Sequence, residues 1–408
     1  MTSALSWLDH DASERDRIQR ILALFKEQDT RDELGLGAIR DAIADLLFPG
    51  TSTIQTRLRY FLFVPWIHRS IEAERLAGEA SAARVRDLEL AIRNALVEGP
   101  FVDGVIGREA GAALKRGPSS VYWAGLGRWA VRRFEGSEDD YHRALPGIHR
   151  ARHGRQTRPV REEPEGAIHT PIETWHPDLP EAPEGFPREA GLTLTLTTEE
   201  ADFLRDLIAR SCRGSLFARL VEWADRPVPD VDFAWEHPDF ARLDPVHQEQ
   251  LGHARSFSLV MNGASVLYNL MLAQKAGREE RAEAHAARLA KWVGRVASAA
   301  PEQWSLPAFW EMVWDRGHTI TPRTQRFVEA WTAEVLADPS GVATRKSARD
   351  LVESRETRLK GARSRFRSQR ALDQWGGSSA VEPLGFRWRT AKTFLNDLHA
   401  ALSGGGGA

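Results

Sequence analysis

The sequence predicts an all-α fold made of two helical domains, with a minor β element and a basic helical C-terminal extension. Apolar residues recur at helical spacing over most of the 408-residue chain, which is typical of amphipathic helices. The pattern is interrupted between residues 146 and 187, where eight of the 21 prolines lie. Positive charge then gathers near the C-terminus, although the net charge of the chain is only -2.

The first domain is expected at residues 1–145. Its first helix is expected at Asp11–Lys26, with one apolar face behind Ser13 as a suitable N-cap. The other helices expected in this domain are Gly37–Phe48, Thr53–Arg75, Ala82–Val97 and Val121–Phe134. Residues 146–190 are expected to form a proline-rich linker, because proline lacks the N–H that a helix interior requires.

The second domain is expected at residues 191–338. Alternating leucine and threonine over Leu192–Leu196 predicts the minor β element, and Thr197 with Glu200 then predicts a helix start. The helices expected in this domain are Ala201–Trp223, Phe257–Gln274, Arg278–Val296 and Arg323–Leu336. Residues 339–402 form a basic region rich in arginine and tryptophan, helical near 343–372 with a weak point at Gly361, and residues 403–408 form a disordered tail.

Cysteine usage and hydropathy indicate a cytoplasmic protein. The single cysteine, Cys212, cannot form an intramolecular disulfide, and its apolar neighbours favour burial over a role as a nucleophile. The N-terminus lacks the basic and apolar parts of a signal peptide. The longest apolar run, Tyr60–Ile67, is too short to span a bilayer, so no membrane partner is expected.

The concentration of positive charge near the C-terminus is the main functional feature of the sequence. Between Arg345 and Arg370 there are ten lysines and arginines and three acidic residues. Such a tract is typical of a surface that binds phosphates, and it predicts DNA or RNA as the partner. The candidate nucleic-acid-binding residues are Arg355, Arg358, Lys360, Arg363, Arg365, Arg367, Arg370, Trp375, Arg387, Trp388, Arg389 and Lys392.

The same tract leaves another partner open. A charged helix also pairs with acidic groups, either within the chain, at Glu353, Glu356 or the first domain, or on a second protein. A membrane surface is less favoured, because no large apolar face accompanies the charge. The alternative function is therefore a protein-interaction scaffold that docks on an acidic partner.

A candidate anion site precedes the helix expected at Thr53–Arg75. Pro49 and Gly50 end one helix, and hydroxyl groups precede the next, whose free N–H groups can receive a phosphate. The alternative is an ordinary capped helix whose arginines pair with Asp41 or Asp45. The candidate residues are Thr51, Ser52, Thr53, Arg57 and Arg59.

Motifs for catalysis and cofactor binding are not found. The chain has no Walker lysine motif, no full dinucleotide-binding glycine pattern and no nucleophile elbow. His149 and His153 have ligand spacing but no third ligand nearby, and His10 between Asp9 and Asp11 is more typical of a polar surface beside a helix cap. We assign no catalytic residue, metal or cofactor, and expect a protein that is not an enzyme. An unrecognised metal-dependent nuclease is a further alternative.

Four parts of the sequence carry a family resemblance: Arg31–Trp66, Ser119–Trp129, Leu192–Glu200 and the tryptophan- and arginine-rich end. They resemble an uncharacterised bacterial family, domain of unknown function 6361. The resemblance implies no activity, but it implies a setting among phage-defence or mobile-element genes that encode helicases and nucleases. With the basic tract, it predicts a non-enzymatic nucleic-acid-binding or accessory subunit in antiviral defence, with a separate helicase or nuclease as protein partner.

Overall fold

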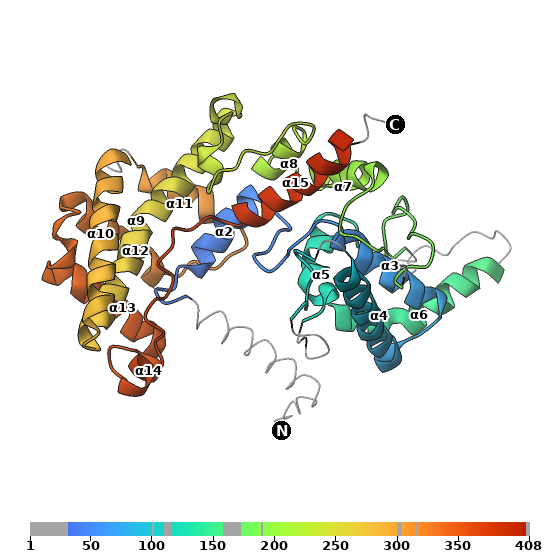
Figure 1. The fold of residues 1–408 in the computed structure, drawn as a ribbon, viewed down its shortest axis with the longest axis horizontal. Helices are drawn as coiled ribbons and strands as arrows, with labels where there is room; N and C mark the ends of the chain where they lie inside the picture. Colours follow the sequence, from blue (N-terminus) through green and yellow to red (C-terminus); the bar gives the residue numbers. More distant parts are fainter. Residues whose placement is uncertain are drawn as a thin grey trace, which may run out of the picture. The chain divides into compact units, whose positions relative to one another are not determined.

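The computed structural model is all-α, as the sequence predicts (Figure 1). It describes residues 32–99, 102–109, 114, 116–157, 173–188, 191–299, 304–314 and 316–404. These residues form 14 α-helices, α2 to α15, and contain no β-strand. The helix expected at Asp11–Lys26 lies outside the described residues.

The described chain divides into two compact units, each built from two stretches of sequence. Unit 1 contains residues 32–43 and Glu249–Phe386, and unit 2 contains residues 44–248 and 387–404. Each unit therefore combines segments that are far apart in the chain. The boundaries expected at 145 and 190 lie inside unit 2, and the one expected at 338 lies inside unit 1.

Unit 2 contains the last helix of the chain together with helices from its first half. Helix α2 (Gly37–Leu47) leads into this unit. Helix α3 packs on α4 and α5, α4 packs on α6, and α15 packs on α7 and α8. Figure 1 shows α15 in red beside the green α7 and α8. The bounds are α3 (Tyr60–Ala73), α4 (Gly78–Glu98), α5 (Pro118–Arg128), α6 (Glu138–Thr157), α7 (Thr198–Ser211), α8 (Leu216–Val221) and α15 (Trp388–Gly404).

An aromatic cluster lies in the core of unit 2. The ring of Phe61 on α3 stacks on Trp129, just after α5, with a centroid distance of 3.8 Å. Phe394 on α15 meets both rings edge-on, at 5.8 and 6.1 Å. The indole N–H of Trp129 donates to the carbonyl of Pro49 at 2.9 Å, so the polar edge of the buried ring is satisfied. Gly50 is required beside it, because a Cβ there would lie 2.3 Å from Trp129 Nε1.

A buried carboxylate connects α15 to the segment before α3. Asp397 accepts the backbone N–H of Leu58 at 2.8 Å and pairs with the guanidinium of Arg57 at 2.8 Å. Burial raises the pKa of Asp397, although the charge and hydrogen bonds of Arg57 oppose that shift. The C-terminal helix thus supplies a group that the chain near residue 58 needs.

Helix α3 begins at Tyr60, and not at Thr53 as predicted. The hydroxyl of Tyr122 accepts the backbone N–H groups of Thr56 and Arg57, at 2.9 and 3.1 Å. A longer helix would use these N–H groups for its own hydrogen bonds. Contacts with other parts of the fold therefore override the local preference for an earlier helix start.

The strand predicted at Leu192–Leu196 is not formed. Its three leucines are buried and its two threonines are more exposed, so the alternation correctly predicts which side chains enter the core. No described strand pairs with the segment. Instead, the carbonyl of Thr193 accepts a hydrogen bond from the guanidinium of Arg59 at 2.8 Å.

Other helix ends differ from the predicted ones for local reasons. Helix α6 continues through Pro146 to Thr157, into the stretch expected as a linker. The helix expected at Ala201–Trp223 is two helices, because the hydroxyl of Ser215 caps α8 by accepting the N–H of Ala218. The capping box predicted at Thr197 and Glu200 is formed at the start of α7.

Unit 1 is organised around α9 (Pro245–Lys275). The indole N–H groups of Trp292 on α10 and Trp331 on α12 donate to carbonyls of Leu259 and Val260 on α9, both at 2.8 Å. Two flanking helices are therefore fixed to adjacent residues of the central one. The other helices of unit 1 are α10 (Glu279–Ala299), α11 (Leu306–Trp314), α12 (Pro322–Ala337), α13 (Lys346–Lys360) and α14 (Gln369–Asp373).

Helix α9 is the one helix of the described chain that is long and apolar enough to cross a membrane. In the structure, 83% of its apolar window is buried inside the protein, as in the core helix of a soluble protein. Polar groups on α9 also have partners within unit 1: the amides of Asn262 and Asn269 donate to the carbonyls of Val381 and Ser379, at 2.8 and 2.7 Å.

The contact of Asp397 predicts a large loss of stability on its removal. We expect Asp397→Ala to lower the free energy of unfolding by about 3 kcal/mol, because Arg57 and the N–H of Leu58 lose their buried partner. Asn396→Ala, at an exposed position one residue earlier on α15, is the control and should change it by less than ~0.5 kcal/mol. Equal urea unfolding curves for the two variants would contradict the role given to Asp397.

Glu89 on α4 gives unit 2 a pH dependence. Its buried carboxylate accepts the backbone N–H of Ser119 at 2.7 Å. Burial raises the pKa of Glu89 from 4.5 to about 7, although the hydrogen bonds from Ser119 oppose the shift. The folded chain therefore keeps a proton that the unfolded chain releases, so the stability from this group is full below pH 4.5 and is lost as the pH rises to about 7.

We expect Glu89→Gln to remove this dependence. Between about pH 5 and about pH 8, the wild type should lose about 3 kcal/mol more of its unfolding free energy than the variant does. Urea unfolding of both proteins across that range measures the difference. Parallel stability profiles would show that Glu89 ionises normally in the folded chain.

Candidate nucleic-acid interface

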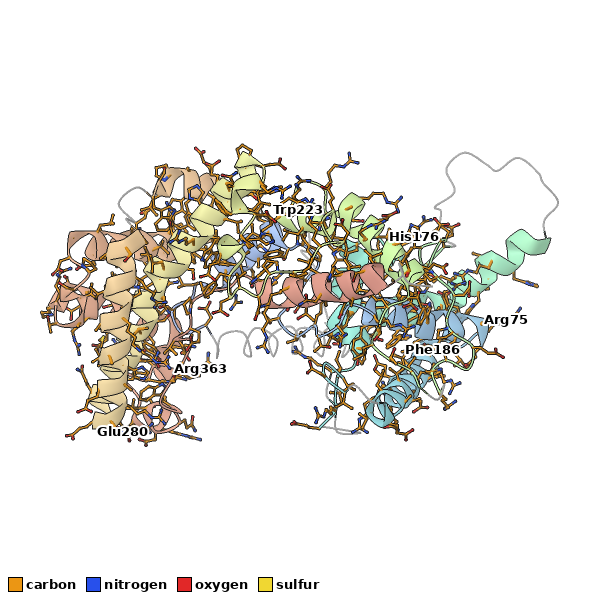
Figure 2. All side chains as sticks on the ribbon, turned by 45° about the horizontal axis from the view of Figure 1, so that its top comes forward. Arg75, His176, Phe186, Trp223, Glu280 and Arg363 are labelled. Carbon is orange, nitrogen blue, oxygen red and sulfur yellow. The ribbon has the colours of Figure 1, made fainter. Side chains whose placement is uncertain are left out.

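The basic segment of unit 1 runs from the end of α13 to α14. Residues 357–372 contain six lysines and arginines and no acidic residue. The chain bends at Gly361, whose φ of +55° ends α13, and a short 3-10 turn follows at Gly361–Arg363. The weak point predicted at Gly361 is therefore a break in the helix. Figure 2 labels Arg363 on this bend.

Arg355, on α13 just before this segment, is used inside the fold. It is buried, and its guanidinium donates to the carbonyls of Leu34 and Gly35, at 2.8 and 3.1 Å. It also donates to the hydroxyl of Thr324 at 2.9 Å. Burial lowers the pKa of Arg355. These contacts attach the residues before α2 to α12 and α13, so Arg355 serves the fold of unit 1.

Lys360 and Arg365 share one buried carboxylate, that of Glu33. The Arg365 guanidinium lies 2.7 Å from Glu33, and Lys360 Nζ lies 3.4 Å from it. Arg365 also donates to the hydroxyl of Tyr268 at 2.9 Å. Intramolecular pairing therefore accounts for part of the basic tract. The acidic partner is far away in the sequence, which explains why spacing along the tract did not indicate it.

The other arginines of the segment are at the surface. Arg358, Arg367 and Arg370 make no ion pair with the part of the chain that the structure describes. Trp375, in contrast, is only 1% exposed and lies under the guanidinium of Arg278, at 5.4 Å. It is not placed to stack on a base. The exposed arginines of the segment are Arg358, Arg363, Arg367 and Arg370.

The remaining candidates belong to unit 2, at the start of α15. They are Arg387, Trp388, Arg389 and Lys392. Arg387 pairs with Asp45. The buried indole of Trp388 and the ammonium of Lys392 both donate to the carbonyl of Val231, at 3.1 and 3.0 Å. Arg389 is exposed. The twelve candidates therefore fall in two units, and four of the twelve form one exposed group on a single segment.

The two arginines of the candidate anion site are paired with other parts of unit 2. That site was predicted at Thr51, Ser52, Thr53, Arg57 and Arg59. No helix begins directly after Thr51, Ser52 and Thr53, because α3 begins only at Tyr60. Arg57 pairs with Asp397, and the buried Arg59 pairs with Glu200 at 2.8 Å. The arginines therefore have carboxylate partners, as in the alternative interpretation, but these are not Asp41 and Asp45.

A cavity of about 290 Å³ in unit 1 does not suit a phosphate. Its acidic lining residues are Asp32, Glu33 and Glu382, and its one basic lining residue is Arg40. Arg40 already pairs with Asp41 at 3.1 Å. Excess negative charge at the walls disfavours an anion, so this cavity is not part of the interface.

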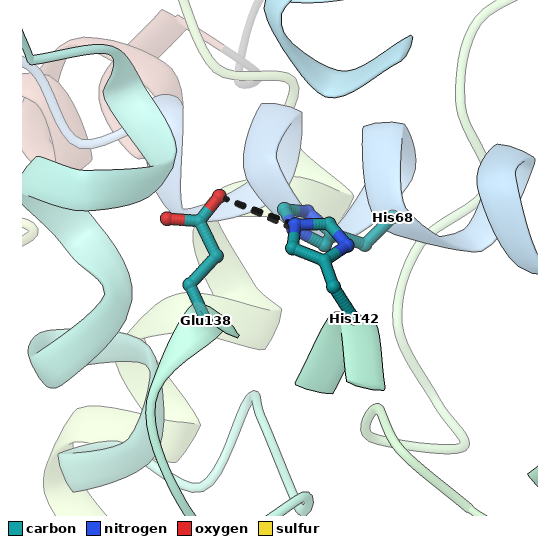
Figure 3. Close-up of side chains that lie close together, drawn as sticks. All are labelled: His68, Glu138 and His142. Carbon is teal, nitrogen blue, oxygen red and sulfur yellow. Dashed lines mark ion pairs between the residues drawn. The ribbon is translucent and has the colours of Figure 1, made fainter. Parts of the chain in front are cut away.

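The described residues contain one group of three side chains that can hold a metal ion. They are His68, Glu138 and His142, in unit 2 (Figure 3). The sequence does not place these residues together, because His68 is on α3 and the other two are on α6. A glutamate four residues before a histidine was the only indication in the sequence. His149, considered there as a ligand, instead lies 3.3 Å from the carbonyl of Leu76.

The different uses of neighbouring arginines predict different effects on stability. We expect Arg355→Gln to lower the free energy of unfolding by about 3 kcal/mol, because two buried carbonyls lose their donor. Arg358→Gln, one turn away on the same helix and exposed, should change it by less than ~0.5 kcal/mol. Urea unfolding measures both values. A small effect of Arg355→Gln would mean that water or other donors replace the guanidinium.

Comparison with known proteins supports the family resemblance of the sequence. The chain matches the family described as "Family of unknown function (DUF6361)" over residues 2–402. No curated protein and no solved structure matches it. The match covers nearly the whole chain and so includes both units. The chain belongs to the family of unknown function DUF6361.

Proposed function

We propose that this protein is a non-enzymatic nucleic-acid-binding protein that contacts phosphates through Arg358, Arg363, Arg367 and Arg370. One observation carries the proposal: these four side chains are exposed on a stretch, 357–372, that contains no acidic residue. Glu33 pairs with both Lys360 and Arg365, and the other four basic residues of the stretch are at the surface. Positive charge concentrated in this way attracts a polyanion.

The proposed contact is with the phosphate backbone rather than with the bases. Arginine presents several N–H donors in a planar fork that suits phosphate oxygens. The nearest tryptophan of the tract, Trp375, is buried and offers no surface for base stacking. The protein should therefore bind with little preference for sequence, and its affinity should fall steeply as salt is added.

We further propose the setting that the family resemblance implies. In that setting the protein is a cytoplasmic accessory subunit of a bacterial antiviral defence system, and it acts beside a separate helicase or nuclease. The alternative, a scaffold that docks on an acidic protein, would use the same exposed arginines. Salt dependence of binding to purified nucleic acids separates the two, because a scaffold needs its protein partner.

The test is neutralisation of the four exposed arginines together, Arg358→Gln, Arg363→Gln, Arg367→Gln and Arg370→Gln. Each phosphate contact contributes about 0.9 to the slope of log affinity against log salt for duplex DNA and about 0.7 for single strands. We therefore expect the variant to bind more weakly, with a slope reduced by about 3. Fluorescence anisotropy with labelled DNA and RNA, single- and double-stranded, measures this over a salt series.

Arg365 is left unchanged in this variant, because its pairing with Glu33 is part of the fold. The control neutralises four exposed arginines that are far apart in the sequence: Arg86, Arg188, Arg242 and Arg316. This control variant loses the same amount of positive charge. It should keep most of the wild-type affinity for nucleic acid and most of the slope of log affinity against log salt. Wild-type affinity in the first variant would exclude the segment as the site. Absence of wild-type binding at low salt would favour an acidic protein partner, and strand cleavage with magnesium would favour the nuclease alternative.

A further inference from the structure

Two helices of unit 2 bring three potential metal ligands together. His68 lies on α3, and Glu138 and His142 lie one turn apart on α6, with both histidines buried. Glu138 is the first residue of α6. Its position is fixed by Ser137 and Asp140, whose side chains accept each other's backbone N–H groups at 2.9 and 3.1 Å. Figure 3 shows the Glu138 carboxylate directed at the two imidazole rings.

Hydrogen bonds determine which nitrogen of His68 carries the proton. Its Nδ1 lies 2.9 Å from the carbonyl of Val64. A carbonyl can only accept, so Nδ1 carries the hydrogen and Nε2 of the neutral ring has a lone pair. Nε2 is buried and has no hydrogen-bond partner within the described chain, and it lies 3.8 Å from a carboxylate oxygen of Glu138.

Hydrogen bonds also determine which nitrogen of His142 carries the proton. The hydroxyl of Ser81 donates its one hydrogen to the carbonyl of Gly78 at 2.7 Å. It therefore accepts at its 2.8 Å contact with His142 Nδ1, which must carry the hydrogen. His142 Nε2 has the lone pair and lies 3.8 Å from the same oxygen of Glu138. This distance is too long for a hydrogen bond.

The two Nε2 atoms and the Glu138 carboxylate oxygen thus face one another with lone pairs, and no hydrogen atom lies between them. From this arrangement we infer that His68, Glu138 and His142 bind a divalent transition-metal ion of the zinc class. Without a cation, a buried lone pair would face a carboxylate oxygen, which is unfavourable. A metal ion satisfies all three groups at once. The outer hydrogen bonds to Val64 and Ser81 are those that commonly orient metal-binding histidines.

The ligand set defines the class of ion. Two imidazoles and one carboxylate suit zinc and neighbouring first-row ions, whereas calcium and magnesium prefer oxygen ligands alone. The three donor atoms lie within 4.8 Å of one another. Zinc bonds of about 2.0–2.1 Å place tetrahedral ligands roughly 3.3 Å apart, so the site must contract slightly. Glu138 is 25% exposed, so movement of its carboxylate can shorten its 3.8 Å distances to the two histidine nitrogens.

The surroundings favour a site with one open coordination position. The ring of His68 lies 5.3 Å from Trp123 and 5.4 Å from Trp175, so one side of the group is enclosed by aromatic rings. Three protein ligands leave a fourth tetrahedral position, which water fills from the side of the partly exposed Glu138. The ion would tie α3 to α6, two helices that no disulfide can connect, since Cys212 is the only cysteine.

The experiment is a zinc titration of the full-length protein after removal of metals with a chelator. Isothermal titration calorimetry should give one site per chain, and cobalt in place of zinc should give the visible absorption of a tetrahedral site. We expect Glu138→Gln and His142→Gln to weaken binding by roughly tenfold or more. Zinc should raise the melting temperature of the wild type and have much less effect on either variant.

The matched control is His149→Gln, two turns further along α6, which should bind zinc as the wild type does. Glu138 is partly exposed, so Glu138→Gln should leave the circular dichroism spectrum unchanged and separate loss of a ligand from loss of the fold. The proposal fails if the wild type shows no saturable zinc binding. It also fails if Glu138→Gln binds zinc as tightly as the wild type, or if His149→Gln loses the site.

Discussion

Unit 2 depends on one buried carboxylate near the end of the chain, that of Asp397. The segment just before α3 is not helical, and Asp397 satisfies both the N–H of Leu58 and the guanidinium of Arg57. On the same helix, Phe394 closes the aromatic cluster of Phe61 and Trp129. Helix α15 is therefore part of the core of unit 2.

Arginine has two physical roles in this protein, and composition alone does not separate them. Arg355 and Arg365 are placed against carbonyls and a carboxylate from the residues before α2, so they hold unit 1 together. Arg358 and Arg367, close to them in sequence, face solvent. What separates the two groups is the position of Glu33 and of the carbonyls near it, and these come from a remote part of the chain.

Helical periodicity was enough to predict the fold class and most helices, because an apolar face must be buried whatever covers it. It predicted α10 and α12 to within a few residues. It failed where remote groups satisfy the backbone, as Tyr122 does before α3 and Arg59 does at Thr193. The basic tract was visible in the sequence, but the division into buried and exposed arginines required knowledge of tertiary partners.

The candidate metal site of His68, Glu138 and His142 also depends on tertiary partners that the sequence does not show. Its three side chains are unremarkable in the sequence, since burial of a histidine on an apolar face is common. What distinguishes them is the direction of their lone pairs, and that direction follows from Val64 and Ser81, which no ligand spacing reveals. Once both Nδ1 atoms carry hydrogens, the space between His68, Glu138 and His142 contains acceptors alone. A cation placed there would satisfy all three groups, so the hydrogen-bond partners of a histidine can indicate a candidate metal site when its sequence does not.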